Sequence, residues 1–294
     1  MKQTSSENGN VSEQSFWSPP EPMTNSEFKA LGDFIQTEFG IKMPLSKKTM
    51  LQSRLTKRLR ALNMSCYRQY QEYLFSAEGL VRELPLLIDA VTTNKTDFFR
   101  EPSHFDLLAD SLLPLWMQKS RGHQRFSVWS AGCATGEEPY SLAMVLGEFA
   151  RREPAFDFEV LGTDISGKAL ETARQAIYPA RRIEPVPTTI RKRYLMRSRD
   201  RAKELVRIVP ELRSKTTFRP LNLMEPFSCP GTKKDAIFCR NVIIYFERPV
   251  QEAIFSRFCA CLKPGGHLFI GHSETLNGMR LPLRTVRPTV YQKV

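Results

Sequence analysis

The chain has 294 residues, of which 41% are hydrophobic, so it can bury one large core or a large and a small one. It contains no long uninterrupted apolar run, and its first ten residues, MKQTSSENGN, lack the apolar stretch of a secretory signal. We therefore expect a cytoplasmic protein. The net charge of +12 indicates an anionic partner, for which nucleic acid, anionic lipid and an acidic protein surface are all candidates.

Cysteine and histidine spacing gives no indication of a metal site. The six cysteines form no CxxC pair, and the four histidines form no HExxH or similar pair. We interpret the cysteines as reduced thiols in the core and expect no metal.

The N-terminal part predicts a tail followed by a small helical domain. Residues 1–22 are polar and contain serines and prolines, which is typical of a flexible tail. Thr24 and Glu27 have the spacing of a capping box, and Gly40 ends a helix predicted over 25–39. A second helix opens at Ser46 with a leucine stripe, and two amphipathic stretches near 66–76 and 79–91 complete an all-helical domain over 23–91.

After a linker over 92–104, the pattern alternates between strands and helices. Helices are predicted at 137–151, 167–177 and 248–262, which gives the rhythm of a doubly wound, Rossmann-like α/β sheet over 105–294. The Arg- and Pro-rich stretch 178–218 is too long for a simple crossover, so we expect a small inserted β subdomain there. The expected buried strands are FSVWS (126–130), FEVLGT (158–163), AIFC (236–239) and LFIG (268–271).

The first strand runs into a glycine-bearing turn, AGCATG (131–136), and a helix that opens with Glu137 and Glu138. Ligands of such sheets bind beyond the carboxyl ends of the strands, where glycines let the backbone approach closely. Carboxylates at this helix start would repel a pyrophosphate but favour a cationic ligand. The charge therefore favours S-adenosylmethionine over a dinucleotide.

Other polar residues follow strands at the same edge of the sheet. Asp164 ends the second strand and is our candidate for binding ribose hydroxyls, although it could also cap the helix that begins near Gly167. Asn222 would reach the same crevice after the insert. The segment CRNVIIYF (239–246) follows a later strand and adds an arginine, an amide and a phenol.

Four separated segments resemble the chemotaxis protein methyltransferases: TTNKTDFFRE (92–101), AGCATGEEPYS (131–141), FCRNVIIYF (238–246) and LKPGGHLFIGHSE (262–274). RLTKRLRAL (54–62) adds to the resemblance, which extends from about residue 24 to the end. It implies transfer of a methyl group from S-adenosylmethionine to glutamate side chains of membrane chemoreceptors, with Arg100 and Tyr245 beside the transferred methyl. The cofactor-binding residues that it implies are Asn94, Thr96, Arg100, Glu137, Asp164, Asn222, Leu223, Asn241 and Val242.

The resemblance also implies a partner, the cytoplasmic helical region of the chemoreceptors, through which the chain would reach the membrane only indirectly. The candidate docking residues are Arg54, Lys57, Arg58 and Arg60, on the second helix. The alternative for these four is an ordinary solvated helix face. The stretch 197–212 lacks the glycines of members that bind a receptor's C-terminal peptide, so we do not expect that tether, and we expect a monomer.

Two other readings remain open from sequence. The net charge and the Arg-rich insert are compatible with nucleic acid binding or nucleic acid methylation, but no NPPY or DPPY segment for a flipped base follows the later strands. The second alternative is an adaptor protein that binds the cofactor and docks receptors without catalysing methyl transfer. For TDFFRE (96–101), a plain linker with packed phenylalanines is the alternative to a cofactor-site segment.

Overall fold

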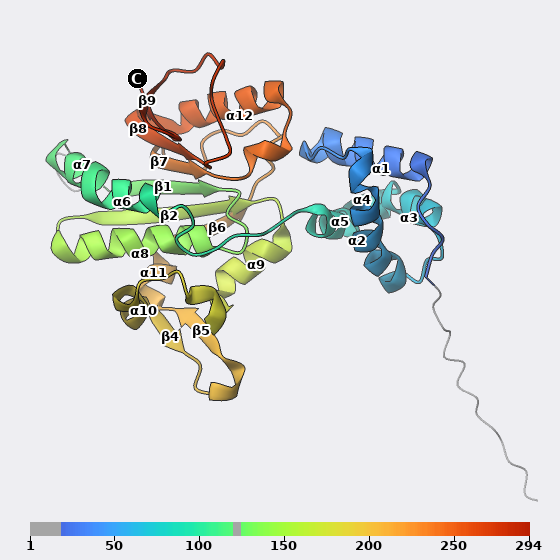
Figure 1. The fold of residues 1–294 in the computed structure, drawn as a ribbon, viewed down its shortest axis with the longest axis horizontal. Coiled ribbons are helices and arrows are strands. Elements are labelled where there is room, and N and C mark those ends of the chain that lie inside the picture. Colours follow the sequence, from blue (N-terminus) through green and yellow to red (C-terminus); the bar gives the residue numbers. More distant parts are fainter. Residues whose placement is uncertain (1–18, 120–124) are drawn as a thin grey trace, which may run out of the picture.

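The computed structural model describes residues 19–119 and 125–294, so the predicted tail lies outside the described residues up to residue 18. A helical domain and an α/β domain follow each other along the chain (Figure 1). Within the described ranges, no helix is long and apolar enough to cross a membrane.

The helical domain forms around leucines and aromatic residues on the inner faces of its helices. Thr24 and Glu27 form both hydrogen bonds of the predicted capping box, and Gly40 ends the first helix in the left-handed region at φ 69°. The second helix begins at Lys48, after a 3-10 turn, instead of at Ser46. The helices are α1 (Asn25–Phe39), α2 (Lys48–Ala61), α3 (Tyr67–Leu74), α4 (Ala77–Arg82) and α5 (Leu84–Val91).

A seven-stranded sheet in the order β6-β2-β1-β7-β8-β10-β9 forms the α/β domain. The first five strands in this order are parallel, while β10 pairs antiparallel with β8 and β9. This confirms the predicted Rossmann-like sheet. The strands are β1 (Arg125–Ala131), β2 (Asp157–Asp164), β6 (Thr216–Pro220), β7 (Lys234–Cys239), β8 (Leu262–Ile270), β9 (Leu283–Arg287) and β10 (Val290–Lys293).

Helices cover both faces of this sheet, as strands without exposed faces require (Figure 1). On one face, α8 (Glu137–Arg152) and the segment containing α6 (Pro102–Leu107) and α7 (Leu113–Lys119) pack into one apolar cluster. On the other face, α12 (Arg248–Cys261) packs into a second cluster around Trp129. Helix α9 (Gly167–Gln175) packs against β2 and β6.

The insert contains a separate three-stranded antiparallel sheet in the order β3-β5-β4, below the main sheet in Figure 1. Residues 216–218, expected within the insert, instead belong to β6 and pair with β2 of the main sheet. This edge strand is only partly buried, so it lacks the continuous apolar run that marks the central strands. The other elements here are β3 (Ile177–Pro179), α10 (Thr188–Tyr194), β4 (Leu195–Arg197), β5 (Leu205–Ile208) and α11 (Pro210–Ser214).

Candidate active site

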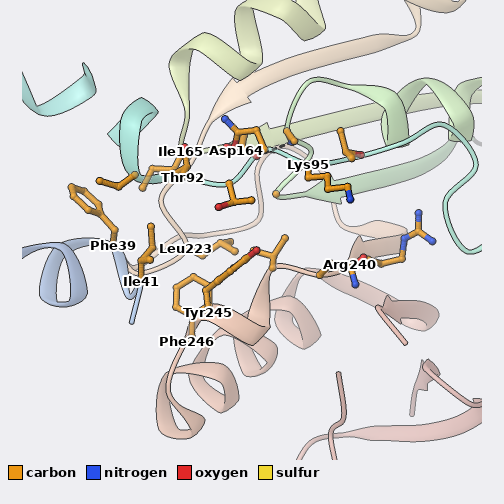
Figure 2. Close-up of a pocket in the computed structure, with 18 of the residues that line it drawn as sticks. Phe39, Ile41, Thr92, Lys95, Asp164, Ile165, Leu223, Arg240, Tyr245 and Phe246 are labelled. Atoms are coloured by element: carbon orange, nitrogen blue, oxygen red, sulfur yellow. Dashed lines mark hydrogen bonds between the residues drawn. The ribbon is translucent and has the colours of Figure 1, made fainter. Parts of the chain in front are cut away.

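A pocket lies between the carboxyl ends of the parallel strands and the helical domain, and Figure 2 shows Phe39 and Ile41 of the helical domain at its wall. All but one of the residues predicted to bind the cofactor or the transferred methyl line this pocket. They are Asn94, Thr96, Arg100, Asp164, Asn222, Leu223, Asn241, Val242 and Tyr245. The fold therefore brings together residues spread over 152 positions of the sequence, from 94 to 245.

Glu137 is the exception, because it is not among the residues that line the pocket. It is buried, accepts a hydrogen bond from Thr135 Oγ1 at 2.6 Å and pairs with Arg182 of the insert. Burial raises the pKa of Glu137, and its bond with Thr135 and the charge of Arg182 oppose that rise. The neighbouring Glu138 lines the pocket instead, but its carboxylate is bound to Arg240 at 2.6 Å. Both carboxylates at the start of α8 thus have internal cationic partners, which the sequence argument for a cationic ligand did not include.

Asp164, at the end of β2, holds the glycine-bearing turn in place. Its two oxygens accept hydrogen bonds from the backbone amides of Ala134 (2.8 Å) and Ser166 (2.9 Å). Burial raises the pKa of Asp164, and these amide bonds counteract that rise. The helix cap is Ser166, whose hydroxyl accepts from Ala169, so the alternative role of Asp164 as the cap is wrong. A carboxylate has lone pairs beyond these two bonds, so Asp164 can also accept from a ligand.

Gly132, directly after β1, allows Val242 to approach the backbone closely. It has φ 74°, and a Cβ built there would lie 2.3 Å from Val242 Cγ2. No side chain fits at that distance, so glycine lets Val242 pack over the end of β1.

One wall of the pocket is the segment 92–101, which we call the strap. Three arginines from three different regions donate hydrogen bonds to backbone carbonyls along it: one from α2, one from the insert and one directly after β7. The donor and acceptor pairs are Arg54 with Thr92 (3.1 Å), Arg182 with Thr96 (2.6 Å) and Arg240 with Arg100 (2.7 Å). These bonds satisfy carbonyls of a segment that forms no helix or strand ladder.

Arg240 also joins a cluster of buried polar groups behind the strap. Its Nη1 lies 3.2 Å from His104 Nδ1 and 3.5 Å from Glu101 Oε2. Burial, and next the charge of Arg240, lower the pKa of His104 to about 4, so this imidazole is neutral near pH 7. Glu101, His104 and His272 place their ligand atoms within 4.8 Å of one another, a set that sequence spacing did not indicate. The cation within this cluster is the Arg240 guanidinium.

The opposite wall is the segment 241–246, which we call the phenol wall because it carries Tyr245. The backbone amides of Asn241, Val242 and Ile243 all donate to the carboxylate of Glu274. Sequence reasoning gave no role to Glu274, although it lies in one of the segments that carry the family resemblance.

The helical domain is attached to this wall and to the end of β6. The amide of Lys42 donates to the carbonyl of Tyr245 at 3.2 Å, and the Asn222 side chain donates to the carbonyl of Glu38 at 2.9 Å. Asn222 therefore lines the pocket and also connects the two domains.

Arg54 and Arg58, two of the predicted docking residues, bind other parts of the chain. Arg54 holds the strap, and Arg58 forms a two-pronged ion pair with Glu83, whose side chain is only 2% exposed. Lys57 and Arg60 have exposed side chains on the same helix. Lys57 and Arg60 therefore stay candidate docking residues.

Two family models match this chain over most of its length. Residues 26–92 match the family model "CheR methyltransferase, all-alpha domain", and residues 94–292 match "CheR methyltransferase, SAM binding domain". Chemotaxis protein methyltransferase 2 of Pseudomonas aeruginosa is 38% identical over 270 residues, covering 91% of this chain and 93% of that protein. The chemotaxis protein methyltransferase of Escherichia coli is 37% identical over 270 residues, covering 92% and 91%.

Among solved structures, the DszA carbon methyltransferase aligns with a TM-score of 0.37 at 16% identity, covering 84% of this chain and 59% of that one. The two family models together span nearly all of the described chain, and their boundary falls at the start of the strap. The chain belongs to the CheR methyltransferase family, with an N-terminal all-α domain and an S-adenosylmethionine-binding methyltransferase domain.

Proposed function

We propose that this protein transfers a methyl group from S-adenosylmethionine to glutamate carboxylates on the cytoplasmic helical region of chemoreceptors, forming glutamyl methyl esters in the cytoplasm. Membership of a family whose relatives are named chemotaxis protein methyltransferases supports this proposal. The observation that carries it is the meeting of Arg100 and Tyr245 in one pocket, from opposite walls.

The groups around the pocket fit S-adenosylmethionine better than a phosphate-bearing cofactor. Glu137 and Glu138, each paired with an arginine of the chain, still occupy the start of α8, where a pyrophosphate would need unopposed amides. The converging amides of the phenol wall are occupied by the Glu274 carboxylate. Asp164 and the side chains of Asn94 and Thr96 would hold the polar parts of the cofactor, while Leu223 and other apolar residues supply packing surface.

Bound S-adenosylmethionine would supply a methyl group activated by a sulfonium. A glutamate side chain has an unperturbed pKa of about 4.3, so the acceptor is ionised at neutral pH and needs no strong base. Alignment of the reactants is then the main requirement, and such alignment can lower a barrier by about 7–11 kcal/mol. The pocket walls must therefore be rigid.

Arg100 and Tyr245 have different tasks in this alignment. Charge is cancelled as the methyl moves, so a tight ion pair between Arg100 and the attacking carboxylate would stabilise the ground state more than the transition state. Arg100 accordingly orients a carboxylate of the substrate or the cofactor without gripping the nucleophile. The hydroxyl of Tyr245 orients the acceptor by a hydrogen bond.

The experiment is incubation of the protein with methyl-labelled S-adenosylmethionine and membranes that contain chemoreceptors, followed by mild base. Methyl esters release label as methanol under these conditions, and this is the expected result. Base-stable label would indicate methylation of an amine or of nucleic acid instead, and no incorporation at all would favour an adaptor without turnover. A matched reaction with receptors whose acceptor glutamates are changed to alanine should give no label.

A further inference from the structure

Glu274 lies in the turn after β8, and its residue is only 8% exposed. Its carboxylate accepts four backbone hydrogen bonds and is the common acceptor for two separate stretches of chain. Oε2 accepts from Gly271 at 2.6 Å and Asn241 at 3.0 Å, and Oε1 accepts from Val242 at 3.0 Å and Ile243 at 2.9 Å. Burial raises the pKa of this carboxyl, and the four amides oppose that rise.

The backbone of the phenol wall is shaped to face this carboxylate. Asn241 has φ 60°, in the left-handed region, and this conformation turns three consecutive amides toward one point. Such a concave group of amides binds anions, and here the anion is a side chain of the chain itself. At the adjacent Gly271, a Cβ would lie 2.7 Å from Asn241 Nδ2, so the Asn241 side chain is packed directly over that glycine.

The same amides begin the turn that carries Tyr245. The 3-10 turn Ile243–Tyr245 starts at the residues bound by Glu274, and the amide of Tyr245 donates to the carbonyl of Val242 at 3.3 Å. A change in the acceptor would therefore move the side chains of Asn241, Val242 and Tyr245 together. Because all three line the pocket, the effect would reach both the cofactor and the acceptor.

We infer that Glu274 is a positioning residue for methyl transfer: its carboxylate fixes the phenol wall so that Asn241 and Val242 meet the cofactor and Tyr245 meets the acceptor. The part that concerns Tyr245 rests on the proposed function, whereas the part that concerns cofactor binding rests only on the S-adenosylmethionine-binding domain. Glu274 does not itself line the pocket, so it acts through the wall.

Asp235 offers a matched control for a merely structural role. It is also 8% exposed and accepts a backbone hydrogen bond from Ser127 at 2.8 Å, together with bonds from Trp116 and Lys263. It lies near the start of β7, at the opposite end of the strand from the phenol wall. Loss of its charge should cost stability without changing the pocket.

The first measurement is calorimetric titration of full-length Glu274→Gln and Asp235→Asn with S-adenosylhomocysteine, alongside thermal unfolding of both. A glutamine offers one oxygen and places an NH2 group against amide donors, so at least one backbone amide loses its acceptor. We expect the Kd of Glu274→Gln to rise about tenfold or more, and that of Asp235→Asn to stay within about twofold at a comparable loss of stability. Equal effects of the two variants on Kd would overturn the inference.

Glu274→Asp keeps four acceptor sites on a shorter stem, so it should fold and bind with an intermediate Kd even if the glutamine variant fails to fold. A wild-type Kd in Glu274→Asp together with a wild-type Kd in Glu274→Gln would also contradict the inference. The role toward Tyr245 is tested by a double-mutant cycle on kcat with Tyr245→Phe, in which non-additive losses are expected and additive losses oppose it. If the wild type binds S-adenosylhomocysteine but esterifies no receptor, the proposed function fails, while the Kd comparison still decides the role of Glu274.

Discussion

The two walls of the pocket are held by opposite chemistry. The strap offers its carbonyls, which are bound by arginines from the helical domain, the insert and the end of β7. The phenol wall offers its amides, which are bound by one carboxylate from the turn after the neighbouring strand β8. The strap carbonyls therefore depend on three distant parts of the fold, whereas the phenol-wall amides of residues 241–243 depend on one adjacent part.

This difference indicates which substitutions should displace each wall. A change in any of three regions can remove a hydrogen bond to the strap. The position of the strap therefore depends on where the helical domain and the insert lie relative to the sheet. The amides of the phenol wall are held at the ends of β7 and β8, and the helical domain reaches this wall through the bond from the Lys42 amide to the Tyr245 carbonyl. Coupling between a partner bound to the insert and the cofactor would accordingly pass through the strap, because Arg182 of the insert holds it, whereas the helical domain contacts both walls.

The largest expected effect comes from Arg240→Met, which removes the donor to the Arg100 carbonyl near the end of the strap. It leaves Glu138 buried beside the pocket without its cation, and breaking such a pair costs about 3–5 kcal/mol. Urea unfolding should show this loss. Adding Glu138→Gln to Arg240→Met should restore part of the stability, because the unpaired charge is gone. A loss below about 1 kcal/mol in the single variant would show that the strap does not need this donor.

The second prediction concerns the pH dependence of stability, which differs between the groups behind the two walls. His104 has a pKa of about 4 in the folded chain against 6.5 for an ordinary histidine, so the unfolded chain takes up its proton first. Stability should therefore fall as pH drops from 6.5 to 4, by about 2–3 kcal/mol for this group. Glu274 has a raised pKa, so its contribution falls in the opposite direction, as pH rises through its folded-state pKa.

The measurement is the free energy of unfolding from pH 7 to pH 4 in the wild type and in His104→Gln. The variant removes one titrating group and should have a shallower slope. Part of the slope should remain, because burial also lowers the pKa of His267 to about 4. Parallel curves for the two proteins would mean that His104 is not held neutral behind the strap.

The third prediction concerns the hydroxyl of Tyr245 on the phenol wall, which Tyr245→Phe removes. Loss of the hydroxyl should slow turnover about tenfold to thirtyfold, a cost of about 1.4–2 kcal/mol typical of one lost hydrogen bond in the transition state. Cofactor affinity should stay nearly intact, since Asn241 and Val242 are unchanged. Weak cofactor binding with normal turnover at saturation would contradict the assigned role, and single-turnover assays with calorimetry distinguish the two outcomes.

The smallest effect concerns α2, where Arg54 donates to the strap and Lys57 has an exposed side chain. Lys57→Glu should change stability by less than about 0.5 kcal/mol, yet weaken receptor methylation at low salt. Lys192→Glu on the insert carries the same charge change at an exposed site on α10 and is the control. Equal methylation rates for the two variants at low ionic strength would remove α2 as the docking face.

Sequence predicted those features that depend on near neighbours or on continuous apolar runs. Thr24 and Glu27 of the capping box are three positions apart, and the central strands are buried on both faces. Both features can therefore be predicted from the sequence. The first three residues of the short edge strand β6 fall within the predicted insert, because this partly exposed strand lacks a continuous apolar run.

The partners of the site residues could not be predicted, because they are far apart in sequence. Arg182 and Glu137 are 45 residues apart, and Arg58 and Glu83 are 25 apart. The fold brings the residues that the family resemblance implies to one pocket, apart from Glu137, which pairs with Arg182. The resemblance could not show which charges are satisfied internally. The roles of Arg54 and Glu274 likewise depend on backbone groups whose orientation only the fold determines.

The central claim is that these two walls enclose a site for a sulfonium donor. Its most direct test is calorimetric titration of the wild-type protein with S-adenosylmethionine and, separately, with NAD. The account predicts saturable binding of S-adenosylmethionine at one site per chain, lost together with strap contacts in Arg240→Met, and no heat from NAD. Binding of NAD in place of S-adenosylmethionine, or no binding of either, would contradict it.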